Sequence, residues 1–187
     1  MPKLIFDFAD PSAVQAWHAI DDRVMGGLSR SGLRHDVQGH AVFEGEVSLE
    51  RNGGFASVRS TPADRGQPDA AACLIEVRGH SSGPTSGNSS GNSSGSVSSR
   101  GDSRQFKLSL LTDNGFDSLN YQARFSPTGG DWQTLRLPLA AFRPSFRGSE
   151  VQGAPGLDPA RVRQVGLMVA DRQAGPFALD IRRISLV

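Results

Sequence analysis

Residues 177–182 read Phe177-Ala178-Leu179-Asp180-Ile181-Arg182. Phe177, Leu179 and Ile181 alternate with small or charged residues, which is the two-residue period of a strand that buries one face. Further short runs of apolar or alternating residues recur along the chain, separated by Gly, Pro, Asp and Asn. This pattern is typical of an all-β sandwich or barrel.

The expected strands and helices follow from these runs and their boundaries. Strands are expected over residues 4–8, 38–49, 55–59, 73–77, 106–111, 119–125, 132–137, 162–169 and 177–187. Asp10 followed by Pro11 predicts one short helix that runs towards Trp17. One turn of helix is expected at residues 139–142, because Pro144 prevents its continuation.

Size and charge narrow the class of protein. With 187 residues and a net charge of +1, we expect one domain, and no long-range charge that favours nucleic acid or an anionic membrane. No run reaches the roughly 18 apolar residues of a transmembrane helix, so no membrane insertion is expected. Residues 1–8 resemble a first strand and not a signal or transit peptide, and the single cysteine, Cys73, has apolar neighbours. These features indicate a cytoplasmic protein with a buried, unreactive thiol.

The segment from His80 to Ser103 consists almost entirely of Ser, Gly and Asn. It cannot bury apolar surface, so we expect a flexible loop at residues 80–103 that interrupts a single domain of residues 1–187. The ends of such a coil can lie side by side, so the strands before and after it remain candidates for a hairpin.

The sequence shows no pattern of catalytic or metal-binding residues. The histidines lack metal-ligand spacing, the Gly-rich phrases lack the Lys-Ser/Thr of a phosphate loop, and no G-x-S-x-G nucleophile elbow occurs. Acidic residues such as Asp113 and Asp117 lie in turn contexts, although a glycosidase-type carboxylate pair and a structural calcium ion stay open as alternatives. We expect no catalytic residue, no metal and no cofactor.

A stronger signal is a polar strip on one strand. Within residues 119–125, Asn120, Gln122 and Arg124 share one face, while apolar side chains share the other. Planar hydrogen-bonding groups in register form either a recognition strip or an ordinary solvated face. Arg59 offers further donors to such a strip, and Trp132, if exposed, adds an apolar anchor.

Two phrases centred on Gly-Gly carry the remaining binding candidates. They are residues 22–29, Asp-Arg-Val-Met-Gly-Gly-Leu-Ser, and residues 52–59, Asn-Gly-Gly-Phe-Ala-Ser-Val-Arg. Flexible glycines beside charged and large apolar side chains suit a contact surface, whose expected members are Asp22, Arg23, Met25, Asn52, Phe55 and Arg59. The alternative is architectural: strands cross closely at the glycines, and Asp22 pairs with Arg23 to fix the turn.

The order of these phrases resembles the family of complex I intermediate-associated protein 30. The matching stretches are residues 22–29, 43–59, 112–116, 120–125, 137–139, 146–148 and 166–177. The resemblance implies a jelly-roll β-sandwich like that of galactose-binding domains. It also implies a non-catalytic role, since mitochondrial members help to assemble the membrane arm of respiratory complex I as chaperone-like factors. This chain lacks their presequence, which suggests a bacterial-type cytoplasmic member. It also departs from them by the insert at residues 80–103.

Two functions follow as expectations. The first is a non-catalytic, chaperone-like assembly factor for respiratory complex I or another protein complex, which binds protein partners through the face around Arg23, Arg59 and the polar strip. The second is a carbohydrate-binding module, because this fold class often binds sugars through aromatic platforms and planar polar groups. Two Trp and one Tyr offer few such platforms, which favours the protein partner.

Overall fold

β13 (Gly175–Leu186), which contains the alternating run of residues 177–182, lies inside a six-stranded antiparallel sheet. The computed structural model describes residues 1–80 and 104–187. The order in this sheet is β3 (Arg30–Asp36), β4 (His40–Val47), β13, β6 (Ala72–Gly79) and β9 (Gln133–Pro138), and β1 (Lys3–Asp7) pairs with the last residues of β13.

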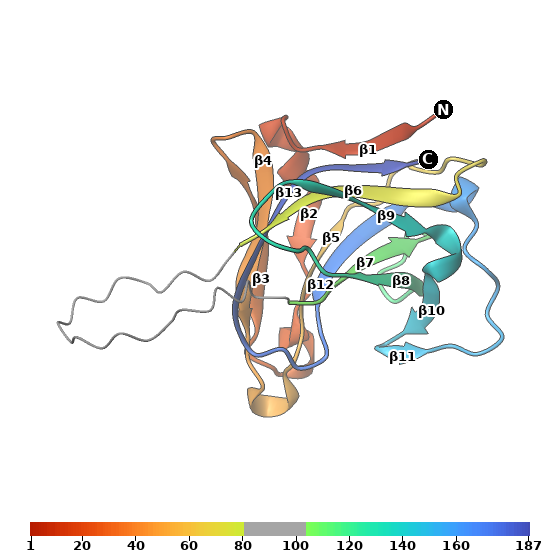
Figure 1. Cartoon of the computed structure of the whole chain (residues 1–187). Helices are drawn as coiled ribbons and strands as arrows, with labels where there is room; N and C mark the ends of the chain where they lie inside the picture. The colour runs from red at the N-terminus through yellow and green to blue at the C-terminus, as the bar shows by residue number, and fades with distance from the viewer. Residues whose placement is uncertain (81–103) are drawn as a thin grey trace.

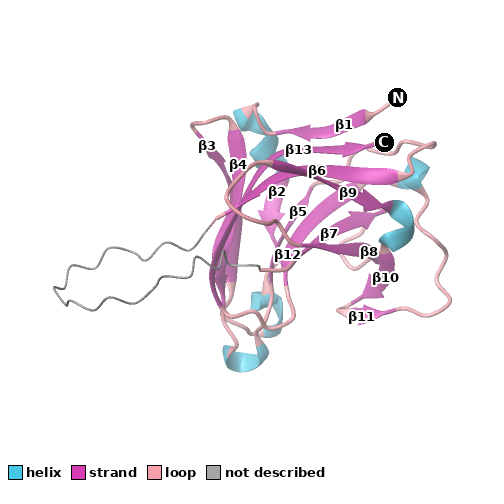
Figure 2. Cartoon of the chain, in the orientation of Figure 1, coloured by secondary structure: helices cyan, strands magenta, loops and turns pink. Residues whose placement is uncertain are grey.

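A second antiparallel sheet of seven strands packs against the first (Figures 1 and 2). The apolar side chains of both sheets enclose one core. Its order is β11 (Ser149–Glu150), β10 (Arg143–Phe146), β8 (Asn120–Phe125), β7 (Phe106–Leu111), β12 (Gln164–Val169), β5 (Ala56–Ser60) and β2 (Trp17–Ala19). The predicted all-β sandwich is confirmed.

β13 keeps its apolar side chains on one face through a β-bulge. Phe177, Leu179 and Ile181 are buried in the core, as predicted. The register with β6 shifts after Ile181, so that Ile184 and Leu186 also reach the core although they are out of the two-residue phase. The bulge therefore lets one strand of twelve residues contribute to the core along its whole length.

The helices of the described residues are all short 3-10 turns. They are η1 (Pro11–Ala16), η2 (Asp22–Met25), η3 (Glu50–Asn52), η4 (Leu139–Ala141) and η5 (Pro159–Arg161). η1 confirms the predicted N-terminal helix, and its first turn is capped by Asp10, whose carboxylate accepts a hydrogen bond of 2.8 Å from the Ser12 N–H. Within the described part of the chain, no helix has the length and apolar character needed to cross a membrane.

Several features of the topology differ from the sequence-based expectation, since the short strands β2, β10 and β11 were not predicted. β3 was not predicted, because it is an edge strand of largely polar, half-exposed residues and lacks an apolar alternation. β6 and β7 lie in different sheets, so the segment between them does not connect a hairpin. The flexible loop predicted at residues 80–103 falls, from residue 81 on, outside the described residues.

Candidate functional site

The predicted polar strip lies on the side of the seven-stranded sheet that faces away from the core. In β8, Tyr121, Ala123 and Phe125 are buried in the core. The alternate residues Asn120 and Gln122 are half-buried on the opposite side of the sheet, and the next alternate residue, Arg124, is exposed there. We call this side of the sheet, with Arg59, Lys107, Ser109, Asn120, Gln122, Arg124 and Gly166, the binding face.

Because of the strand register, two residues with small side chains lie between two with long side chains in one row of the binding face. Gln122 pairs with Ser109, Ser109 with Gly166, and Gly166 with Arg59, so the four residues form one row across β8, β7, β12 and β5. From Gln122 to Arg59 the row spans three strand spacings, about 14 Å at ~4.8 Å per spacing. The two central residues have small side chains and are buried, with Ser109 at 5% exposed, so the longer side chains of Gln122 and Arg59 form the accessible ends of the row.

Arg59 lies at one end of this row. Its Nη1 donates to the Phe116 carbonyl oxygen at 2.8 Å, its Nη2 lies 3.5 Å from Asn120 Oδ1, and its guanidinium carbon lies 5.7 Å from the centre of the Phe116 ring. Burial lowers the pKa of Arg59, while the charges of Asp113 and Asp117 oppose the shift. The guanidinium has five donors, so it keeps capacity for the oxygens of a bound group.

The opposite end of the binding face is a small charged cluster around Asp171. Lys107 Nζ lies 3.2 Å and Arg124 Nη2 3.3 Å from the carboxylate of Asp171, and Arg124 Nη1 donates to Gln105 Oε1 at 2.9 Å. All three charged side chains are at least partly exposed, so these pairs orient the cations more than they stabilise the fold. Lys107 and Asp171 were not predicted, since only the strand pairing places them beside Arg124.

The two Gly-Gly phrases meet at the buried carboxylate of Asp22. Its Oδ1 accepts from the Ser29 N–H at 2.9 Å, and its Oδ2 accepts from Ser29 Oγ at 2.5 Å and from the N–H groups of Gly54 and Phe55 at 2.8 and 3.3 Å. Burial by itself raises the pKa of Asp22, but these hydrogen bonds outweigh it, so the net shift is downward. Asp22 is 0% exposed and therefore cannot contact a partner, contrary to the expectation.

Each Gly-Gly pair serves two geometric needs. Gly26 and Gly54 have φ angles of +86° and +146°, which favour glycine. A Cβ at Gly27 would collide with the Asp22 carboxylate, and one at Gly53 with both that carboxylate and the Ser48 carbonyl oxygen. The architectural alternative therefore holds for the glycines themselves.

The charge pairing that was expected within the first phrase involves a different residue. Arg23 Nη2 lies 3.5 Å from Asp21 Oδ2, so Arg23 pairs with Asp21 and not with Asp22. Asp21 is also buried and accepts hydrogen bonds from the N–H groups of Ser31 and Ser57 at 3.1 and 3.0 Å. The two adjacent acids thus fasten this loop to both sheets, since Ser31 belongs to β3 and Ser57 to β5.

The remaining predicted site residues lie apart from the strip. Arg23, Met25 and Asn52 are exposed on the η2 and η3 turns, and Phe55 is half-buried beside Asp22. The structure therefore brings Arg59, Asn120, Gln122 and Arg124 onto one face and leaves the others on loops.

Trp132 lies on the other sheet of the sandwich, not on the binding face. The guanidinium carbons of Arg182 and Arg78 lie 4.0 and 4.7 Å from the centre of its ring, and the His40 ring packs edge-on at 5.4 Å. Arg78 in turn donates to the buried Asp180 carboxylate at 2.8 Å through Nε. Sequence reasoning placed Trp132 in the strip because it could not assign the residue to a sheet.

Aromatic platforms are scarce on the binding face. Trp17 and Tyr121 are 9% and 3% exposed and pack in the core. Phe116, at 64% exposed, is a large aromatic residue beside Arg59. Over residues 1–80 and 104–187, no three His, Cys, Asp or Glu side chains gather closely enough to hold a metal ion.

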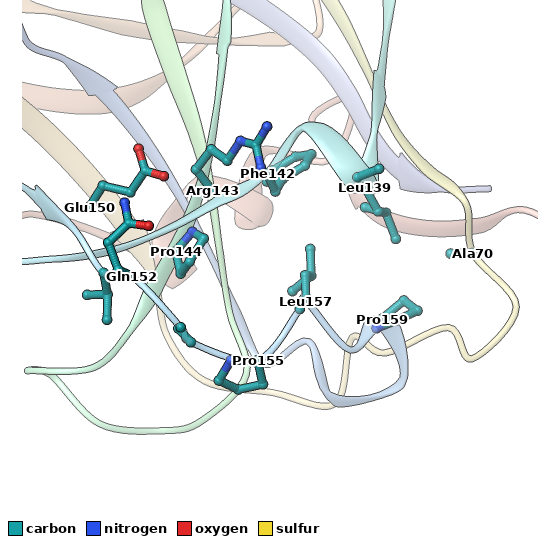
Figure 3. Close-up of a pocket in the computed structure, with 15 residues that line it drawn as sticks. Ala70, Leu139, Phe142, Arg143, Pro144, Glu150, Gln152, Pro155, Leu157 and Pro159 are labelled. Atoms are coloured by element: carbon teal, nitrogen blue, oxygen red, sulfur yellow. The ribbon is translucent and has the colours of Figure 1, made fainter.

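A pocket of about 450 Å³ opens beside the binding face, between η4, β10 and the segment of residues 150–159 (Figure 3). Leu139, Phe142 and Leu157 line its apolar part, and Arg143 and Glu150 its polar part. Arg143 is also the register partner of Gln122, so the pocket adjoins one end of the row across the sheet.

Three comparisons relate the chain to known proteins. It is 27% identical over 190 residues to an uncharacterized protein of Schizosaccharomyces pombe, covering 92% of this chain and 78% of that one. It is 23% identical to the mouse protein "Complex I intermediate-associated protein 30, mitochondrial", covering 96% of this chain but only 54% of the mouse protein. The fold matches that of a family 11 carbohydrate-binding module from Clostridium thermocellum with a TM-score of 0.65 and 15% identity, over 100% of this chain and 95% of the module.

The structural match establishes a galactose-binding-like jelly-roll sandwich. The sequence model of the complex I intermediate-associated protein 30 family matches residues 6–181, which is nearly the whole chain. On this match, the chain belongs to the complex I intermediate-associated protein 30 family.

Proposed function

We propose that this domain is a non-catalytic binding protein that acts as a chaperone-like assembly factor, for respiratory complex I or for another protein complex. The family suggests a role related to complex I assembly, and the mouse relative bears that name. The chain spans about half of the mouse protein, so the specific partner is part of the proposal.

The observation that supports this proposal is the row of polar groups on the binding face. Arg59, Asn120 and Gln122 present donors and acceptors there in fixed register. An extended polypeptide presents carbonyl oxygens and N–H groups at a regular spacing, which such planar polar groups can match. The cluster of Lys107 and Arg124 adds positive charge at one end, which favours a segment with an acidic residue there.

The test is capture of partners by variants that differ only on the binding face. The wild type, the double variant Gln122→Ala with Arg124→Ala, and the control Arg136→Ala on the exposed side of β9 are immobilised, and bound proteins are identified by mass spectrometry. We expect respiratory-complex subunits to be retained by the wild type and the control and lost with the double variant. Recovery of no respiratory or membrane subunit by the wild type would argue strongly against the assembly role.

A carbohydrate is the second candidate ligand. Phe116 beside Arg59 is the observation that favours it, because an exposed ring next to planar polar groups is an arrangement that suits a sugar. One ring makes a poor platform, so we rank the sugar second. A glycan array with the wild type and Phe116→Ala decides the matter: binding that the variant loses supports the sugar. The cytoplasmic location stays a prediction, since the mouse relative is described as mitochondrial.

A further inference from the structure

The loop that joins β7 to β8 folds back against the binding face. We call this loop, residues 112–119, the strap. Gln164 Nε2 donates to the carbonyl oxygens of Asp113 and Gly115 at 2.9 and 3.1 Å. Gln164 is 3% exposed and belongs to β12, so the strap reaches over a strand that it does not connect. One buried amide thus binds two backbone carbonyl groups of the strap.

Two arginines hold the next two residues of the strap. Arg59 Nη1 donates to the Phe116 carbonyl oxygen at 2.8 Å, and the Phe116 ring lies over the same guanidinium. Arg147, in the turn after β10, pairs with the carboxylate of Asp117. These contacts use groups that a second polypeptide can also offer: backbone carbonyl oxygens, an aromatic ring and a carboxylate.

A buried apolar side chain lies beneath the strap. Leu110 packs in the core, so its neighbour Leu111 points to the opposite side of β7, towards the binding face. Leu111 is nevertheless 0% exposed. Its register partners are Gln164 and Asn120, and both donate to carbonyl oxygens of the strap. The strap therefore covers a site with an apolar floor and hydrogen-bond donors at its sides.

The strap can leave this site without unfolding the sheet. Residues 113–117 are exposed, so little apolar surface holds them in place. The side chains of Arg147 and Asp117 are 72% and 48% exposed, and ion pairs and cation–π contacts at such exposure are weak. Segments with few buried contacts open locally at a small cost in free energy.

The charges at the site favour an acidic replacement for the strap. The two acids whose charges act on Arg59 both belong to the strap and leave with it. Displacement then exposes Arg59, Arg147 and Arg163, whose Nε donates to a side chain of the strap at 3.1 Å. Glu150, whose register partner is Ser145, lies on the same side of the sheet and offsets one of these cations. A segment that brings a carboxylate restores the lost pairing.

We propose that the strap occupies the site of the partner segment, and that a polypeptide with an aromatic residue followed by an acidic residue displaces it. The aromatic residue takes the place of Phe116 on Arg59, and the acid takes the place of Asp117 on Arg147. The carbonyl oxygens of the segment accept from Arg59 and Gln164. This inference rests on the proposed function, because it names the chemistry of the protein segment that the binding face accepts.

The experiment measures binding of a fluorescein-labelled synthetic peptide, with the sequence of residues 112–119, to the full chain by fluorescence anisotropy. In the double variant Phe116→Ala with Asp117→Ala, the strap loses its two anchoring side chains while the residues that hold it remain. This variant should bind the peptide about tenfold more tightly than the wild type, because apparent affinity rises with the open fraction. Hydrogen exchange should become faster for the strap amides and stay unchanged for the core strands, which verifies that the variant is folded.

Matched controls tie the gain to this site. Addition of Arg59→Ala to the double variant should abolish the gain, and Arg136→Ala on the other sheet should bind like the wild type. A peptide with alanine in place of both the aromatic and the second acidic residue should bind neither protein. Equal binding by the wild type and the double variant would overturn the proposal. Weaker binding by the double variant would also overturn it, and would make Phe116 part of the contact surface.

The peptide separates this proposal from the assembly role. If the wild type captures no respiratory subunit but the double variant gains affinity for the peptide, the assembly role alone fails. If the wild type and the double variant Phe116→Ala with Asp117→Ala capture subunits equally, the strap does not compete with the partner, and this inference alone fails.

Discussion

A domain with Asp22 replaced by alanine should unfold under much milder conditions than a domain with any surface substitution. The change removes the acceptor of three backbone N–H groups, those of Ser29, Gly54 and Phe55, and of the Ser29 hydroxyl. A buried donor left without a partner costs about 1–3 kcal/mol. The 3.3 Å bond to Phe55 counts for less, and water entering the vacated space offsets part of the cost, so we expect a loss of about 3–5 kcal/mol.

The assay is equilibrium unfolding in urea, followed by circular dichroism, with Asp131→Ala as the exposed control. A loss of 3–5 kcal/mol corresponds to a decrease in Tm of roughly 6–20 °C for a domain of this size. The control should stay within about 0.5 kcal/mol of the wild type. If Asp22→Ala lies within about 1 kcal/mol of the control, the reasoning on the hydrogen-bond network is refuted.

The pH dependence provides a second measure of the same network. The pKa of Asp22 is lowered in the folded state from its ordinary value of 3.8, so the ionised carboxylate stabilises the fold above that value. The stabilisation is lost as the pH falls from 3.8 through the lower folded-state pKa. The difference in unfolding free energy between the wild type and Asp22→Asn should therefore shrink between about pH 5 and pH 2. A difference that is constant over this range would contradict the assignment.

Three further predictions concern other sites. Gly53→Ala should destabilise by about 1–3 kcal/mol in urea unfolding, because its Cβ meets the Ser48 backbone, whereas Gly32→Ala, which has open space, should be nearly neutral; equal effects would contradict the packing argument. Burial raises the pKa of Cys73 to about 12, so the thiol should react with a thiol reagent only as fast as the protein unfolds, and rapid labelling of the native protein would refute its burial. Asp180→Ala should cost about 2–4 kcal/mol by thermal unfolding, since it leaves Arg78 without its buried carboxylate, and a Tm equal to that of the wild type would rule out this role.

The strands of the core could be predicted because each carries its own signal. The strand predicted at residues 106–111 has the same bounds as β7. The alternation of residues 119–125 correctly assigned Tyr121 to the core and Gln122 to the other face. The edge strands β3 and β11 gave no such signal, because a strand that buries few side chains does not need apolar residues at every second position.

The candidate site was predictable only in part. Asn120, Gln122 and Arg124 share a face through the period of a single strand, which the sequence contains. Lys107 joins them through the pairing of the consecutive strands β7 and β8. Arg59 was predicted for the strip, and its place there depends on β12 and β5, which lie far from each other in the chain. Met25 was predicted as a contact residue of the same surface, but it lies exposed on the η2 turn, apart from the strip, which only the folded chain shows.

The sequence by itself determined the all-β class, the buried face of β13 and the family, because these rest on local periodicity and on the order of short phrases. Only the tertiary structure decided what the Gly-Gly phrases do. It turned Asp22 inward, where the N–H groups of a second loop could satisfy its charge, and left Met25 outward. The physical reason is that a carboxylate is buried only where several donors converge on it, and the Gly54 N–H, 32 residues along the chain from Asp22, reaches that carboxylate only in the folded chain.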